Sequence, residues 1–258
     1  MHILIMGRPR CRTSFLSMAY RDYYGLEYLH ETFFESVKPL WIKANALRTK
    51  DNLNKLQQSH IQSLKNITKK IFLSDGAIIK FFPRDVMTHC YVNLKFTDIQ
   101  NFNYKCITNL SEVFQLEKYN QILLLERNFL DSAMSFIYGH VMGIMLFERN
   151  VSKTFYEKKI TPVTITEQHL QLLNFYILEY LVDQNIKKFV RTRYSCKTLD
   201  YNIIPNFVEE NFNNSKTNYY VDLELDYKNL IVNYQEIVEY INLKLEEYSN
   251  NYKSVTFT

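Results

Sequence analysis

The chain has few residues arranged to hold a metal ion. Its four cysteines, at positions 11, 90, 106 and 196, form no C-x-x-C pair and no zinc-site spacing. Its six histidines form no H-x-x-x-H pair. These absences exclude the common zinc-binding patterns, so we expect no metal. Cysteines without a disulfide framework indicate a reducing compartment, and we expect a cytoplasmic protein.

The chain also lacks long hydrophobic runs and a strong charge of one sign. No apolar stretch reaches the roughly 20 residues that span a bilayer. An apolar segment of strand length begins so early that no secretory signal precedes it. We therefore expect a soluble chain without a membrane span. The net charge of +4 suits an anionic ligand but is too small for a nucleic-acid-binding surface.

The apolar residues that are present predict the fold. They make up 47% of the 258 residues, enough for a packed core, and no repeat or linker divides the chain, so we expect one domain over residues 1–258. Short apolar segments predict strands at 3–6, 25–29, 77–82, 122–125 and 219–225. Helical spacing predicts helices at about 38–48, 52–72, 86–94, 110–119, 131–147, 167–188, 204–212 and 230–248. This alternation predicts a three-layer α/β fold, with a mainly parallel central sheet flanked by helices.

The first strand leads directly into a basic loop. The run 3–6 ends at Gly7 and is followed by Arg8-Pro9-Arg10-Cys11-Arg12, by Thr13-Ser14, and by a segment of helical spacing that begins with Phe15. In this layout the backbone N–H groups of the loop and the helix N-terminus point at one spot, where the helix dipole favours an anion. The stretch predicts an anion site; the alternative is an ordinary strand-to-helix turn with unrelated arginines.

The loop differs from that of nucleoside-triphosphate-binding proteins. When G-x-x-x-x-G-K-[ST] is laid on Gly7, the second glycine falls on Arg12, the lysine on Thr13 and the hydroxyl on Ser14. Kinases and ATPases need that lysine on the β- and γ-phosphates. The missing lysine therefore indicates an anion loop of another kind.

A second basic element follows the most apolar predicted strand. The run 122–125 leads through Glu126 into Arg127, with Asp131 and Ser135 one helical turn apart beyond it. Open α/β sheets hold ligands at the carboxyl ends of their strands, so Arg127 is placed to grip a phosphate with two parallel N–H donors. Ser135 can add a hydroxyl donor, and Asp131 is expected to cap the helix or orient Arg127. Alone, Arg127 is better explained by a surface salt bridge; paired with the first loop, it favours phosphate binding.

These two elements resemble the phosphate-binding motifs of sulfotransferases. The family pattern P-R-[ST]-G-T-T is similar to Pro9-Arg10-Cys11-Arg12-Thr13-Ser14, and the P-R-x-R-T variant of small phage-type members is closer still. The second family pattern, R-x-P-x-D-x-x-x-S, is matched at Arg127, Asp131 and Ser135, with Phe129 in place of the proline. Two spaced motifs in the right order are moderately specific.

The resemblance implies a P-loop-like fold and a defined co-substrate. It implies transfer of a sulfuryl group from 3′-phosphoadenosine 5′-phosphosulfate (PAPS) to a hydroxyl or amine of a small-molecule, sugar or lipid acceptor, without a metal. The implied nucleotide-binding residues are Arg10, Cys11, Arg12, Thr13, Ser14, Phe15, Arg127 and Ser135. Arg10 is also expected to stabilise charge during the transfer.

The transfer needs a base near the acceptor, and two neighbouring residues qualify. Glu31 follows the second predicted strand, and the resemblance implies a glutamate base in a similar segment; Phe33 and Phe34 nearby would raise its pKa by burial. His30 is the alternative, because its ordinary pKa of about 6.5 suits proton transfer. Either residue could instead cap the following helix. Lys80, on the third strand, is expected to be a third cation at the site or to extend to solvent.

Arg12 and the C-terminal segment depart from the family pattern. Arg12 stands where relatives usually have glycine, so it either contacts the sulfuryl group or replaces glycine without a role of its own. The basic, glycine-rich segment that ends the family's nucleotide site is not evident. Two alternatives stay open: a P-loop nucleotide kinase or NTPase, in which Glu126 would be the strand-end acid, and a degenerate nucleotide-binding protein without turnover.

Overall fold

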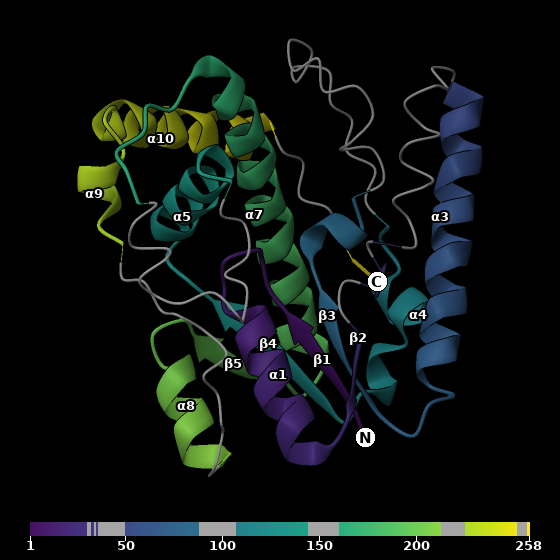
Figure 1. Ribbon diagram of the computed structural model, residues 1–258. Helices are drawn as coiled ribbons and strands as arrows, with labels where there is room; N and C mark the ends of the chain where they lie inside the picture. Colours follow the sequence, from purple (N-terminus) through teal and green to yellow (C-terminus); the bar gives the residue numbers. More distant parts are fainter. Residues whose placement is uncertain are drawn as a thin grey trace.

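The central sheet is parallel throughout and has five strands. The computed structural model describes residues 1–29, 32, 33, 35, 50–87, 107–143, 160–212, 225–251 and 257–258. Within these residues the strands are β1 (His2–Met6), β2 (Glu27–Leu29), β3 (Ala77–Phe81), β4 (Gln121–Glu126) and β5 (Lys197–Asp200). They pair in the order β2-β3-β1-β4-β5 (Figure 1).

The apolar runs of the sequence become the three inner strands. Every residue of β3 is buried, and so are all of β1 except His2 and the four central residues of β4. Parallel strands covered on both faces need apolar side chains at successive positions, which is why these segments are runs rather than alternations. In the register, Ile3 of β1 pairs with Ile78 of β3 and with Gln121 of β4.

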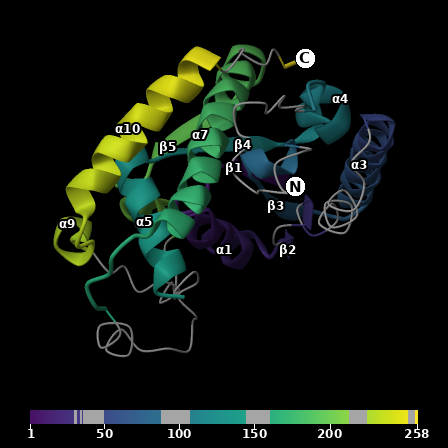
Figure 2. The same cartoon turned by 90° about the horizontal axis from the view of Figure 1, so that it is seen from above.

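Helices cover both faces of the sheet. On one face, α1 (Thr13–Tyr24) and α8 (Ile204–Asn211) pack on side chains of β1, β3, β4 and β5. The other core contains α3 (Lys50–Ile71), α4 (Leu110–Phe114), α5 (Phe129–Val141), α7 (Glu167–Arg193) and α10 (Tyr234–Asn251). Figures 1 and 2 place α3 and α10 at opposite ends of the molecule. The prediction of a three-layer α/β fold with a parallel central sheet is confirmed.

The strand order reverses at the middle of the sheet, between β1 and β4. From β1 the chain passes through α1 towards β2, whereas from β4 it passes through α5 and α7 to β5 on the opposite edge. Neighbouring strands whose connections leave in opposite directions form a crevice at their carboxyl ends, where open α/β sheets bind ligands. The loops that follow β1 and β4 meet at this crevice.

Several predicted elements differ from the observed ones. The prediction missed β5, whose four residues include a single buried one. The helix predicted at 86–94 does not begin at Val86, because Val86 and Met87 follow a short 3₁₀ turn (Pro83–Asp85) and are not helical. Residues 88–94 lie outside the described residues. The helix predicted at 110–119 ends at Phe114, because Gln115 takes a left-handed backbone conformation with φ 49°.

The remaining differences lie near the end of the chain. The predicted last helix is α10 preceded by the short α9 (Tyr227–Leu230). The predicted strand 219–225, apart from Leu225, and the predicted helix 38–48 lie outside the described residues.

Candidate functional site

The loop after β1 packs tightly against the loop's own helix and β4. A methyl group added at Gly7 would lie 3.2 Å from Cβ of Leu125 and 3.3 Å from Cγ2 of Thr13, closer than ordinary contact. The amide N–H of Gly7 donates to the carbonyl of Phe81 on β3 (3.2 Å). A larger residue at position 7 would therefore require Leu125 and Thr13 to shift by a few tenths of an ångström.

Two arginines give the loop its curvature. Arg10 and Arg12 have positive φ angles of 69° and 59°, a left-handed conformation usually left to glycine. Arg12 is the N-cap residue of α1, and its carbonyl accepts from the N–H of Leu16 (3.1 Å). Arg12 thus adopts the backbone that a glycine would adopt at this position, at a strain of about 1–2 kcal/mol.

The Arg12 side chain compensates for this strain through Tyr201, just beyond β5. Its Nη1 donates to the carbonyl of Tyr201 (2.7 Å), and its Cζ lies 3.8 Å from the centroid of the Tyr201 ring. The Cζ of Arg127 lies 4.0 Å from the same centroid. Nη1 of Arg127 also donates to the carbonyl of Arg10 (2.8 Å). The structure therefore brings the two predicted phosphate elements together and adds a residue that the sequence did not reveal.

Lys80 reaches the loop from β3. Its side chain is 1% exposed, and its Nζ donates to Oγ of Ser14 at the start of α1 (2.9 Å). A lysine that extends to solvent buries its methylene groups and keeps its ammonium exposed. Lys80 is buried to its end, so the alternative that it extends to solvent is wrong. A cation therefore lies at the helix N-terminus, at the hydroxyl that would coordinate Mg²⁺ in a kinase or ATPase.

A fully buried arginine lies beneath the loop. Arg8 is 0% exposed, and its guanidinium donates to Oγ of Ser132 (2.9 Å), to the carbonyl of Arg127 (3.1 Å) and to Oδ2 of Asp183 (3.3 Å). Its Cζ also lies 4.8 Å from the centroid of the Tyr180 ring. Burial by itself lowers the pKa of Arg8, but nearby groups that can carry negative charge, Tyr176 and Asp183 among them, raise that pKa overall. Arg8 is a permanent charge inside the protein.

A second buried ion pair joins α7 to the 3₁₀ turn after β3. Nε of Arg84 donates to Oε1 of Glu179 (2.7 Å) and Nη2 to Oε2 (3.3 Å), while Glu179 is fully buried. Burial raises the pKa of Glu179, and Arg84 opposes that rise.

Burial lowers the pKa of His140 at the end of α5, and the charges of Arg10 and Arg84 lower it further.

The remaining predicted nucleotide-binding residues lie along α1 and α5. Cys11 is buried in the core beneath α1, so only its backbone faces the loop, and burial raises the pKa of its thiol. Thr13 is 5% exposed, and Phe15 packs against the same core. Ser135 lies in the second turn of α5 with 8% exposure.

Asn128 caps α5, so the prediction that Asp131 does so is wrong. Oδ1 of Asn128 accepts from the N–H of Asp131 (3.2 Å), which places Asp131 in the first helical turn. Its carboxylate is favourable there, because it lies near the positive end of the helix dipole.

The two candidate bases, His30 and Glu31, lie outside the described residues. Among the residues that are described, no group of three or more His, Cys, Asp or Glu is placed to hold a metal ion. Searching the same residues for a helix long and apolar enough to cross a bilayer also finds none.

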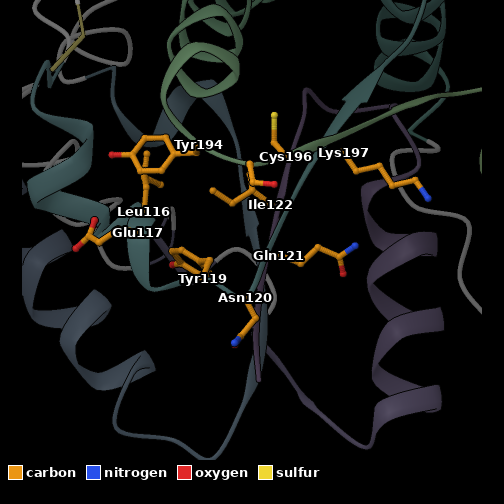
Figure 3. A pocket seen from close by; sticks show the side chains of 10 residues that line it. Leu116, Glu117, Tyr119, Asn120, Gln121, Ile122, Tyr194, Cys196 and Lys197 are labelled. Carbon is orange, nitrogen blue, oxygen red and sulfur yellow. The ribbon is translucent and has the colours of Figure 1, made fainter.

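The hollow shown in Figure 3 lies at the opposite, amino-terminal edge of the sheet. It has a volume of about 350 Å³ and is formed where β4 and β5 begin, at Gln121 and Lys197. Ile122 of β4 also lines it, and its other lining residues come from the segments just before these strands: Leu116, Glu117, Tyr119, Asn120, Tyr194, Ser195 and Cys196. It is separate from the cluster of arginines.

The sequence did not reveal that Arg8 is buried, and it did not point to Tyr201 at all. The basic loop gave no sign that Arg8 alone turns inward, and Tyr201 follows the strand that was not predicted.

Comparison of the chain with models of protein families matches no family, and comparison with curated proteins finds no similar one.

Proposed function

We propose that this protein is a sulfotransferase that moves a sulfuryl group from PAPS to a hydroxyl or amine of a small-molecule, sugar or lipid acceptor. The observation that carries the proposal is the convergence of Arg12 and Arg127 on the Tyr201 ring, 3.8 and 4.0 Å from its centroid, beside the loop that begins α1.

The arrangement suits a ligand with two separate phosphate groups. The N-terminus of α1 and the curled loop amides favour the 5′-phosphosulfate. The two guanidinium groups near Tyr201 favour the 3′-phosphate, because a phosphate monoester carries about −1.5 to −2 charges at pH 7 and arginine binds it with paired N–H donors. Binding both groups at once distinguishes PAPS from nucleotides that carry phosphate at one end only.

The reaction balances without a metal or a redox partner. The acceptor hydroxyl oxygen attacks sulfur, the bond between sulfur and the bridging 5′-phosphate oxygen breaks, and the hydroxyl proton passes to a base. The leaving 3′-phosphoadenosine 5′-phosphate keeps the bonding electron pair. We assign the base to Glu31, with His30 as the alternative, and the stabilisation of charge on the leaving phosphate to Arg10 and Lys80.

Contacts that cations make with two polar groups weigh against a kinase or ATPase. The carboxylate of Glu126, the candidate strand-end acid, accepts from Arg191 (2.5 Å) and lies 3.4 Å from Nζ of Lys187. The hydroxyl of Ser14 accepts from Lys80 (2.9 Å). The two groups expected to serve Mg²⁺ in such enzymes are therefore both bound to cations.

Calorimetry tests the nucleotide. We expect the protein to bind 3′-phosphoadenosine 5′-phosphate in preference to ATP with Mg²⁺, and Arg127→Ala to abolish that binding. Arg21→Ala is the control, because Arg21 lies in the last turn of α1 and pairs with Asp22. Preference for ATP with Mg²⁺ would overturn the proposal.

Turnover tests the base. Glu31→Gln should keep nucleotide binding and lose sulfuryl transfer to the acceptor. If transfer survives in Glu31→Gln and is lost in His30→Gln, the base is His30. If the wild-type protein binds the nucleotide but transfers to none of a panel of hydroxyl and amine acceptors, it is a nucleotide-binding protein without turnover.

A further inference from the structure

We propose that Arg8 is a positioning residue that fixes the separation between the two phosphate-binding loops and so gives the protein its preference for a bisphosphorylated nucleotide. This inference rests on the proposed function for the identity of the nucleotide. Its structural part, the coupling of the two loops through one buried side chain, can be tested without any ligand.

Arg8 belongs to the first loop but makes its contacts in the second. From its place directly after Gly7, its Nη2 donates to the carbonyl of Arg127 (3.1 Å), and its Nη1 to Oγ of Ser132 in the first turn of α5 (2.9 Å). Arg127 returns the contact by donating to the carbonyl of Arg10 (2.8 Å). The two loops are therefore joined by hydrogen bonds in both directions, and each bond has an arginine as its donor.

Side chains of helix α7 form hydrogen bonds with this junction. Oδ2 of Asp183 accepts from Arg8 (3.3 Å) and from Nζ of Lys187 (2.7 Å), and Lys187 also donates to the carbonyl of Leu125 at the end of β4 (2.6 Å). The hydroxyl of Tyr176 donates to the carbonyl of Pro9 (2.9 Å). One helix thus contacts the backbone of the first loop at Pro9 and the backbone of β4 just before the second loop, and its Asp183 binds Arg8 between them.

The geometry requires a guanidinium rather than merely a positive charge. The donors to Ser132, Arg127 and Asp183 leave three different nitrogens of one planar group. A lysine ammonium is a single point on a flexible stem and cannot reach three partners in that arrangement. Arg8→Lys keeps the charge and removes the fixed geometry, so it separates the positioning role from a general electrostatic effect.

The effect on binding should depend on how many phosphates the ligand carries. A nucleotide with a 5′-phosphate alone contacts one loop, so its affinity should not depend on the position of the other loop. A nucleotide with both 5′- and 3′-phosphates gains its second contact only if the loops stand at the right separation, since misplaced donors lose directed hydrogen bonds. Loss of Arg8 should therefore reduce the advantage of the second phosphate.

The chain supplies a matched control in the Arg84–Glu179 pair. It too joins an arginine near the sheet edge to a buried carboxylate on α7, one turn from Asp183, and its two hydrogen bonds run between Arg84 and Glu179. Glu179→Gln therefore perturbs the same helix through a comparable buried pair, while it removes no donor or acceptor of the hydrogen bonds that join the two loops.

The experiment combines two measurements on wild type, Arg8→Lys, Arg8→Gln and Glu179→Gln. The first is amide hydrogen exchange of the ligand-free proteins. We expect faster exchange in both loops, residues 8–13 and 127–132, in the Arg8 variants, and no such paired change in Glu179→Gln. The second is the ratio of affinities for 3′-phosphoadenosine 5′-phosphate and adenosine 5′-phosphate. We expect this ratio to fall by about tenfold or more in both Arg8 variants, the size of a lost charged hydrogen bond.

The possible outcomes separate the two proposals. If wild type shows no preference for the bisphosphate, the proposed function fails, and the exchange data alone decide whether Arg8 couples the loops. If wild type shows the preference and Arg8→Lys keeps it, with unchanged exchange in residues 127–132, the positioning role is overturned. An equal fall of the ratio in Glu179→Gln would also overturn it, because the effect would then belong to α7 in general.

Discussion

The two edges of the sheet are built in opposite ways. At the amino-terminal edge the protein leaves a hollow of about 350 Å³, whose two charged lining residues, Glu117 and Lys197, are both exposed. At the carboxyl edge charged side chains are buried and hydrogen-bonded: Arg8 donates to the backbone carbonyl of Arg127, and Lys80 donates to the hydroxyl of Ser14. Burying a charged group costs several kcal/mol of folding free energy unless the group is paired. A fold that buries more than one such group therefore gives up stability to hold particular groups in place. Open space and desolvated, partnered charge therefore point to opposite edges of this molecule, and perturbed charged groups are the feature that clusters at functional sites.

The largest expected difference between the edges is in stability. Asp183→Ala leaves the buried cations Arg8 and Lys187 without their shared carboxylate, and removal of one partner from a buried pair costs about 3–5 kcal/mol. Glu117→Ala at the hollow should change the free energy of unfolding by less than about 0.5 kcal/mol. Urea unfolding of both variants measures the difference, and equal losses would show that the two edges are not distinct.

The next effect separates stability from binding. Arg12→Gly relieves a left-handed backbone strain and also removes the contacts to Tyr201. We expect a change in unfolding free energy of no more than about 1 kcal/mol, together with a loss of about 10-fold or more in affinity for 3′-phosphoadenosine 5′-phosphate. Calorimetry and urea unfolding measure both, and unchanged affinity would mean that Arg12 only replaces glycine.

A smaller contrast concerns two glycines, one near each edge. Gly7→Ala places a methyl group 3.2 Å from Cβ of Leu125, and overpacking of this kind costs about 1–3 kcal/mol. Gly25→Ala, at the end of α1, meets nothing within 4 Å and suffers only from its φ of 65°, for about 1 kcal/mol. Thermal unfolding of the pair ranks them, and a larger loss in Gly25→Ala would contradict the close packing inferred at the loop.

The smallest expected effect is on pH dependence. Burial, with the nearby cations Arg10 and Arg84, lowers the pKa of His140 in the folded state. The neutral form is then favoured by folding, so this contribution to stability is present above the unfolded pKa of about 6.5 and is lost as the pH falls through the lower folded pKa. His140→Gln should therefore lose slightly less stability than wild type between pH 7 and pH 5, as measured by the midpoint of thermal unfolding. A steeper loss in the variant would mean that the folded pKa of His140 is not lowered.

The sequence predicted the buried half of the fold better than its rim. Strands β1, β3 and β4 were predictable because both of their faces are covered, which demands continuous apolar runs. Strand β5 was missed because an edge strand with only Leu199 buried carries almost no such signal. The break at Gln115 was also hidden, since nothing in its neighbours' pattern requires a left-handed residue there.

The candidate site divides in the same way. Motif spacing singled out Arg10, Arg12 and Arg127, which are close to strand ends and can be placed by counting. It could not reveal that Arg8 turns inward to Asp183 or that Tyr201 lies beside two arginines, because those contacts join residues far apart in the chain. Such contacts depend on helix α7 and strand β5 being in place, and no local pattern encodes them.

The central place of β1 has a consequence for folding. Ile3 pairs with Ile78 on one side and with Gln121 on the other, so the middle strand of the sheet has no neighbouring partner nearby in sequence. Closing such long stretches of chain is entropically costly before any contact repays it, and proteins rich in distant contacts fold slowly. The hydrogen bonds between the loop after β1 and the segment after β4 require these two strands to be side by side, so we expect this junction to form late in the folding of the chain.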